Sequence, residues 1–182
     1  MANKEALREL QSRLAERLLA ARTQPSGRSW LAVECGSRGF LFALKEAGEI
    51  FALAPVTPVP HAQAWFLGVA NLRGHLHGVV DLARFLGIKS ADRPHEAVRE
   101  QARLVAFNAA SEINCALWVD RLAGLKNEHE LTVRARAPES GPTPAFVGQI
   151  YSDQGGFLWQ ELHLGELASD DTFLSITATA TA

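Results

Sequence analysis

The feature that most restricts the fold of this chain is an internal repetition among short strand-like runs. Phe66-Leu67-Gly68 recurs as Phe146-Val147-Gly148, 80 residues later. Thirteen positions after each glycine stands an acidic residue followed by leucine, Asp81-Leu82 and Glu161-Leu162, and no gap is needed. The repetition predicts two similar lobes, each of which ends in a strand and a short helix.

The two lobes are too small to be independent domains. A weaker upstream echo, Phe42-Ala43-Leu44 against Cys115-Ala116-Leu117, supports the duplication. Each lobe would hold about 60 to 70 residues, a size at which a single hydrophobic core is marginal. We therefore expect their apolar faces to pack against each other. Because long crossover helices are missing, the pattern favours a mainly β protein of small barrels over a parallel sheet.

Glycine and proline divide the chain into strands and connections. Besides the run before Arg73, strands are expected at 30–35, 40–44, 49–53, 76–80, 103–108, 113–119, 122–126, 146–151 and 156–160. Asp81 is expected to cap a short helix over 82–86, and 161–168 repeats that pattern. The connections are expected at 54–61 and 136–144, each with three prolines, and the polar stretch 88–101 is expected to join the lobes.

The two ends differ from the strand-rich middle. Leucines at 7, 10, 14 and 18 recur among charged residues, which predicts an amphipathic helix over 4–22. The leucine face of this helix could pack against the chain's own domain or against another chain. We divide the sequence into a helical extension (1–28), one domain (29–174) and a frayed Thr/Ala tail (175–182).

The composition argues against several classes of protein. The net charge of −2 gives no general attraction to nucleic acid or anionic membranes. Cys35 and Cys115 lie in separate apolar segments, which excludes a disulfide scaffold and a cysteine-rich metal site. The sequence has no run of about 20 apolar residues and no signal peptide, so we expect a cytoplasmic protein without membrane insertion.

Candidates for catalysis are few. His75 and His77 would lie on one face of a strand, and with Asp81 they could serve a small metal-assisted hydrolase. An RNA-binding module of SH3-like fold is another alternative. Phosphate-binding loops, nucleophile elbows and zinc-protease motifs are missing, and no cofactor is expected. The conspicuous charge is Arg73, between two apolar runs, which favours a non-catalytic binding module.

The segment around Arg73 carries a family resemblance. Gly68-Val69-Ala70-Asn71-Leu72-Arg73-Gly74, followed by Val79-Val80-Asp81-Leu82, resembles the first-lobe signature of the CheW family of chemosensory coupling proteins. Residues 116–122 are similar to the second-lobe pattern G-L-x-V-D-x-V, with Ala116 and Leu122 as departures. The resemblance covers about 29–174. Ala70 and the N-terminal extension look most like members that serve type IV pilus (twitching motility) pathways.

The resemblance implies a fold and a function. The fold would be two interlocked, SH3-like, five-stranded β-barrels with an added N-terminal helix and short lobe-terminal helices. The function would be that of a non-catalytic adaptor between methyl-accepting chemoreceptors and a CheA-type histidine kinase. The cleft between lobes would take the cytoplasmic tip of a receptor, and one lobe would pack on the kinase's regulatory domain.

The resemblance also implies site residues. Arg73 matches the family arginine at the receptor- and kinase-control surface, and Glu49 matches an acid 19 residues before Gly68. A pairing of Glu49 with Arg73 across neighbouring strands is implied. Ala47, His75 and His77 depart from the family pattern in ways that bear on partner choice, as does Gln160-Glu161-Leu162 on the kinase-facing side. The same surface is expected to include Ile50, Val59, Gly68, Asn71, Leu72 and Gly74.

Overall fold

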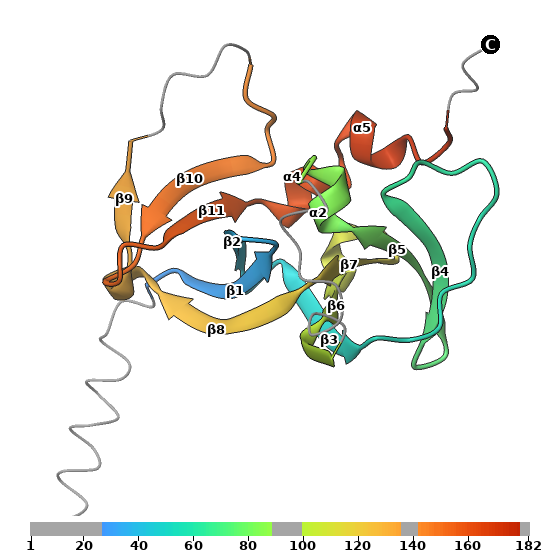
Figure 1. Cartoon of the computed structure of the whole chain (residues 1–182), viewed down its shortest axis with the longest axis horizontal. Coiled ribbons are helices and arrows are strands. Elements are labelled where there is room, and N and C mark those ends of the chain that lie inside the picture. The colour runs from blue at the N-terminus through green and yellow to red at the C-terminus, as the bar shows by residue number, and fades with distance from the viewer. Residues whose placement is uncertain (1–26, 89–99, 136–141, 179–182) are drawn as a thin grey trace, which may run out of the picture.

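The computed structural model describes residues 27–88, 100–135 and 142–178 (Figure 1). The strands are β1 (Ser29–Cys35), β2 (Arg38–Ala43), β3 (Ala47–Ala52), β4 (Phe66–Leu72), β5 (His75–Asp81), β6 (Arg103–Phe107), β7 (Cys115–Val119), β8 (Arg121–Asn127), β9 (Thr132–Arg134), β10 (Val147–Ser152) and β11 (Leu158–Leu162). The helices are α2 (Leu82–Phe85), α4 (Leu164–Ala168) and α5 (Asp171–Leu174), with 3₁₀ turns at Ala109–Ser111 and Glu128–Glu130. The expected helix over 4–22 lies outside the described residues.

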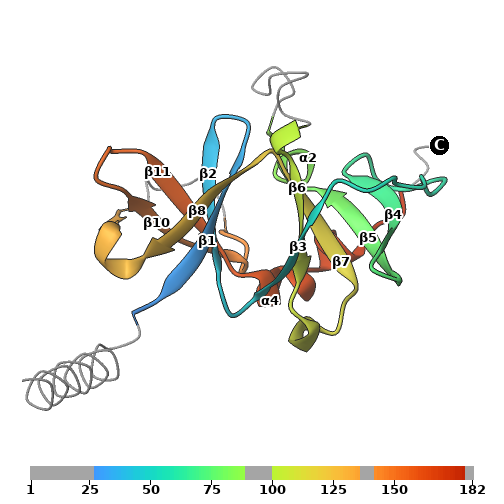
Figure 2. The same ribbon diagram turned by 90° about the horizontal axis from the view of Figure 1, so that it is seen from below.

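The strands form two sheets built on one plan, and the sheets lie side by side (Figures 1 and 2). One sheet has the order β8-β1-β2-β11-β10-β9, and the other has β3-β6-β7-β5-β4. In each, a hairpin joins the rest of the sheet through one parallel pair, β11 with β2 or β5 with β7. The duplicated, mainly β fold predicted from the sequence is thereby confirmed, with β9 as an additional strand in one sheet.

The chain passes from one sheet to the other twice. After β2 it crosses at Leu44–Glu46 into the five-stranded sheet, and after β7 it returns at Asp120. The stretch 88–101, expected to join the lobes, instead connects α2 to β6 of the same sheet. That expectation was wrong because the β1–β2 hairpin finds its partners β8 and β11 far along the chain, where no local pattern shows them.

The weaker sequence echo identifies equivalent strands but misaligns them. Glu161 pairs with Leu41, and its counterpart Asp81 pairs with Trp118. Leu41 and Trp118 therefore hold equivalent positions in β2 and β7. This register is displaced by four residues from the alignment that the echo of Phe42 with Cys115 suggests.

The largest hydrophobic cluster belongs to both sheets. Along β1, Leu31 and Val33 face this shared cluster, whereas Trp30 and Ala32 face a smaller cluster inside their own sheet, as the alternation of side chains along a strand requires. Leu117 of β7 is fully buried in the shared cluster from the opposite side. The expected packing of the two lobes against each other is confirmed.

The two lobe-terminal helices begin differently. Asp81 caps α2 as predicted, because its Oδ1 accepts the Arg84 N–H at 3.1 Å. Glu161 does not cap α4, because it lies inside β11, is 3% exposed and accepts the Trp30 Nε1–H at 2.9 Å. Glu46, in the first crossing, takes over that role by accepting the Leu164 N–H at 2.7 Å.

The C-terminal segment is ordered further than the sequence predicts. The Gln63 N–H donates to the Ile176 carbonyl at 2.7 Å, and the Ala178 N–H donates to the His61 carbonyl at 2.8 Å. Residues 175–178 are thus paired with the chain before β4, which corrects the expectation of a frayed tail from 175 onward. In the described part of the chain, no helix has the length and apolar character needed to span a bilayer.

Candidate protein-interaction site

Arg73 lies in a strained turn at the tip of the β4–β5 hairpin. Leu72 pairs with His75, which leaves Arg73 and Gly74 as a two-residue loop with φ of 50° and 89°. Such a turn, with positive φ at both central residues, favours asparagine, aspartate or glycine at the first of them. An L-residue with a Cβ loses roughly 1 to 2 kcal/mol there. Asn71 supports the turn, since its Oδ1 accepts the Gly74 N–H at 2.8 Å.

The side chain of Arg73 is exposed but oriented. Its guanidinium forms an ion pair with Glu49 of β3, and its Cζ lies 5.9 Å from the centre of the Phe51 ring. The implied Glu49–Arg73 pairing is therefore present, but not across neighbouring strands, because β3 lies at one edge of the sheet order and the β4–β5 hairpin at the other. With 74% of the Arg73 side chain exposed, the pair contributes only about 0 to 1 kcal/mol to stability. The contacts fix the direction of the guanidinium, which has five N–H donors in all.

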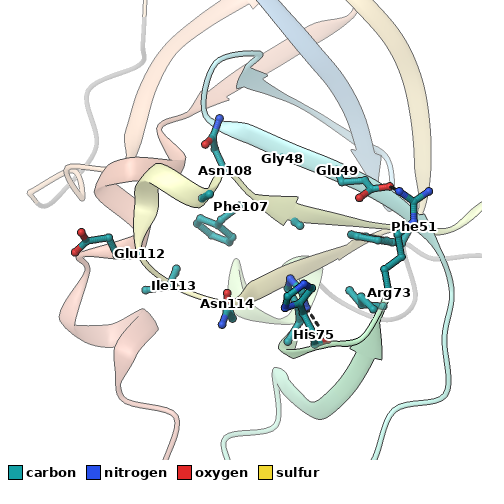
Figure 3. Close-up of a pocket in the computed structure, with 14 residues that line it drawn as sticks. Gly48, Glu49, Phe51, Arg73, His75, Phe107, Asn108, Glu112, Ile113 and Asn114 are labelled. Atoms are coloured by element: carbon teal, nitrogen blue, oxygen red, sulfur yellow. Dashed lines mark hydrogen bonds and ion pairs between the residues drawn. The ribbon is translucent and has the colours of Figure 1, made fainter.

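A groove of about 510 Å³ adjoins this arginine (Figure 3). Figure 3 shows Glu49 and Arg73 meeting beside Phe51 at one end, with Glu112 at the other end. The groove lies over the five-stranded sheet and combines apolar and polar lining. It is lined by Gly48, Glu49, Phe51, Leu72, Arg73, His75, His77, Ala106, Phe107, Asn108, Ala109, Glu112, Ile113 and Asn114.

His77 forms part of the groove wall and is held on two sides. Its Nδ1 lies 3.1 Å from the carbonyl oxygen of His75. Its ring centre lies 6.2 Å from that of Phe51. Phe51 thus lies beside both Arg73 and His77.

The structure divides the expected interaction residues into two groups. Asn71, Gly74, Ile50 and Val59 are exposed, although neither Ile50 nor Val59 lines the groove. Asn71 and Gly74 shape the turn that presents Arg73.

Two of the expected interaction residues have structural roles instead. Gly68 is buried with φ of 135°, and a Cβ there would lie 2.1 Å from the carbonyl oxygen of Thr57. Leu72 is 3% exposed and packs in the core of the five-stranded sheet. Their place in the signature is explained by close backbone approach and by core packing, although Leu72 also lines the groove.

The sequence analysis did not identify Phe51 as a site residue and did not predict that His77 lies near Arg73. The alternation of side chains along a strand could have identified Phe51. Residues two apart in a strand face the same side, so Phe51 follows from Glu49 once Glu49 is paired with Arg73. The position of His77 depends on the pairing of β5 with β4 and on the approach of β3, neither of which is a local property.

The geometry does not support a metal-assisted hydrolase. His75 and Asp81 stand at opposite ends of β5, six residues apart, or about 20 Å along a strand. Asp81 is buried and engaged with Arg84 through both carboxylate oxygens. Among the described residues, no group of three or more His, Cys, Asp or Glu side chains could hold a metal ion.

Comparisons with known proteins agree with the fold and the signature. The family model described as "CheW-like domain" matches residues 29–172. "Chemotaxis protein CheW" of Rhizobium meliloti (strain 1021) is 41% identical over 66 residues, which are 36% of this chain and 43% of that protein. "Protein PilI" of Pseudomonas aeruginosa is 27% identical over 166 residues, 90% of this chain and 88% of that protein. The matched region thus spans less than half of the first relative and most of the second.

A solved structure shares the fold. The scaffolding protein TtCheW from Thermoanaerobacter tengcongensis superposes with a TM-score of 0.60 over 76% of this chain and 92% of that chain, at 17% identity. Together with a family match that spans most of the sequence, the two sheets and the Arg73 hairpin identify the protein's class. This chain belongs to the CheW-like domain family.

Proposed function

We propose that this protein couples methyl-accepting chemoreceptors to a CheA-type histidine kinase in the cytoplasm, in a pathway that controls type IV pili and twitching motility. The observation that carries the proposal is the presentation of Arg73, an exposed cation held at positive φ in a turn where other residues are better suited. Backbone strain of this kind persists where function uses it. The near full-length likeness to PilI supports the pilus pathway.

The groove beside Arg73 suits the receptor. It is open, is lined by both apolar and polar residues, and has an oriented guanidinium at one end. Arginine is among the residues that most often dominate binding energy at interfaces. Contacts of this size are individually weak, but arrays of receptors and kinases multiply them.

The six-stranded sheet offers a surface on which the kinase could pack. Its β10–β11 hairpin is the counterpart of the Arg73 hairpin and carries two exposed apolar side chains at its tip, Phe157 and Leu158. Trp159 packs beneath Phe157, with ring centres 4.9 Å apart. A rigid apolar tip of this kind fits packing against the kinase's regulatory domain. Receptor and kinase would then hold opposite sheets of one body, and a change in receptor geometry would reach the kinase through it.

The test compares two arginines that are both exposed and ion-paired. Arg73→Ala should raise the Kd for a receptor cytoplasmic fragment of the same organism about 30-fold, the effect of a hot-spot arginine worth about 2 kcal/mol. Arg121→Ala, which removes the partner of Glu34 on the other sheet, should leave this Kd unchanged. Receptor binding by Arg73→Ala at the wild-type Kd would contradict the proposal. Loss of swimming rather than twitching in a deletion strain would contradict the pilus assignment.

A further inference from the structure

Resting on the proposed function, we infer the kind of group that the receptor brings into the groove. The geometry points to a hydrogen-bond donor, a hydroxyl, amide or ammonium group, that docks on Nε2 of His77. His77 is then a specificity-determining residue of this adaptor.

The position of the proton on His77 follows from its partner. The carbonyl oxygen of His75 can only accept, and it lies 3.1 Å from His77 Nδ1, so Nδ1 carries the hydrogen. In a neutral imidazole with Nδ1 protonated, Nε2 is an acceptor only. The ring packs against Phe51 and lines the groove while remaining partly exposed. Nε2 is therefore the ring nitrogen left to accept from a partner that enters the groove.

The charges that face the groove agree with a donor rather than a carboxylate. Glu49 comes from β3, Arg73 from the β4–β5 turn and Glu112 from the connection between β6 and β7. Arg73 offsets one of the two carboxylates, so the rim carries one net negative charge while His75 and His77 are neutral. A partner carboxylate would meet this charge and the lone pair of Nε2, whereas a donor is attracted by both.

The experiment measures the Kd of the full-length protein for the receptor cytoplasmic fragment. His77→Phe keeps a ring beside Phe51 but has no acceptor, so its Kd should rise about 3- to 10-fold, the equivalent of one hydrogen bond. His77→Gln keeps an acceptor in its amide oxygen and should bind more tightly than His77→Phe. His129→Phe, which replaces an exposed histidine in the 3₁₀ turn after β8, is the matched control and should leave the Kd unchanged. Thermal unfolding checks that each variant is folded.

Three results would overturn the inference. A His77→Phe variant that binds at the wild-type Kd would show that no donor of the partner docks on Nε2. A His77→Gln variant that binds as weakly as His77→Phe would assign the loss to the ring and not to its acceptor. In both cases a weakened Arg73→Ala variant would leave the proposed function intact. If Arg73→Ala binds like wild type, the groove is not the docking site, and the proposed function fails with the inference.

Discussion

Arg73→Gly separates the stability of the β4–β5 turn from its function. The substitution relieves roughly 1 to 2 kcal/mol of backbone strain at a φ of 50°. It loses an exposed ion pair of about 0 to 1 kcal/mol and a cation–π contact of about 0.5 to 1 kcal/mol. Glycine also makes the unfolded chain more flexible, which costs about 0.5 to 1 kcal/mol. These contributions nearly cancel, so the free energy of unfolding of the variant should be within about 1 kcal/mol of the wild-type value.

Arg73→Ala provides the matched comparison, because it loses the same side-chain contacts but keeps the strain. The difference in the free energy of unfolding between the two variants therefore reports the backbone contribution alone. The glycine variant should be more stable than the alanine variant by about 0.5 to 1 kcal/mol. For a chain of 182 residues this is a difference in Tm of about 1 to 4 °C. Both variants should bind the receptor fragment poorly, although the glycine variant folds at least as well.

Urea and thermal unfolding followed by circular dichroism would measure the stabilities, and receptor binding would be measured on the same samples. An alanine variant more stable than the glycine variant would show that Arg73 is not strained. A loss of more than about 3 kcal/mol in either variant would show that Arg73 is part of the core structure. Either result would remove the reasoning that assigns the arginine to partner binding.

Two further predictions concern buried groups. Burial, followed by the charge of Glu161, raises the pKa of Tyr151, the single tyrosine of the chain. An ultraviolet titration should therefore show phenolate at higher pH in the folded protein than in urea, and Glu161→Gln should reduce the difference. The stabilisation from this neutral phenol is complete below about pH 10, the ordinary value, and is lost as pH rises toward the raised pKa; identical titrations of folded and unfolded protein would contradict this. Burial also raises the pKa of Cys115 to about 12, and Cys35 is fully buried, so neither thiol should react with Ellman's reagent near pH 8 until the protein unfolds. A thiol of the folded protein that reacts as fast as free cysteine would be inconsistent with this burial.

Features set by neighbouring residues were predictable from the sequence. Asp81 caps α2 because a short acid before an apolar run can accept from the N–H three residues on. The same reasoning failed for Glu161, although the two acids are equivalent in the duplication. The cap of α4 comes from Glu46, 118 residues away from Leu164. The carboxylate of Glu161, which does not cap the helix, accepts a hydrogen bond from the Trp30 indole instead.

The candidate site was predictable in part, and only through the family signature. The contact of Glu49 with Arg73 joins strands that are not neighbours in the sheet order, β3 and the β4–β5 turn. Composition and periodicity contain no information about that approach. The signature supplied it, but it did not distinguish residues that present Arg73 from those that support the fold, such as Gly68 and Leu72.

The distribution of the core decides how this adaptor can move. Among the residues that the structure describes, the cluster shared by the two sheets contains 20 buried residues, whereas the clusters inside the sheets contain six and five. Cores of the latter size cannot hold a lobe of about 60 to 70 residues folded alone. Separating the sheets would therefore expose most of the hydrophobic core, and the chain crosses between them twice. A hinge between the lobes would carry this cost. Under the proposed function, a partner at the Arg73 groove would therefore move the whole body together with a partner at the β10–β11 tip.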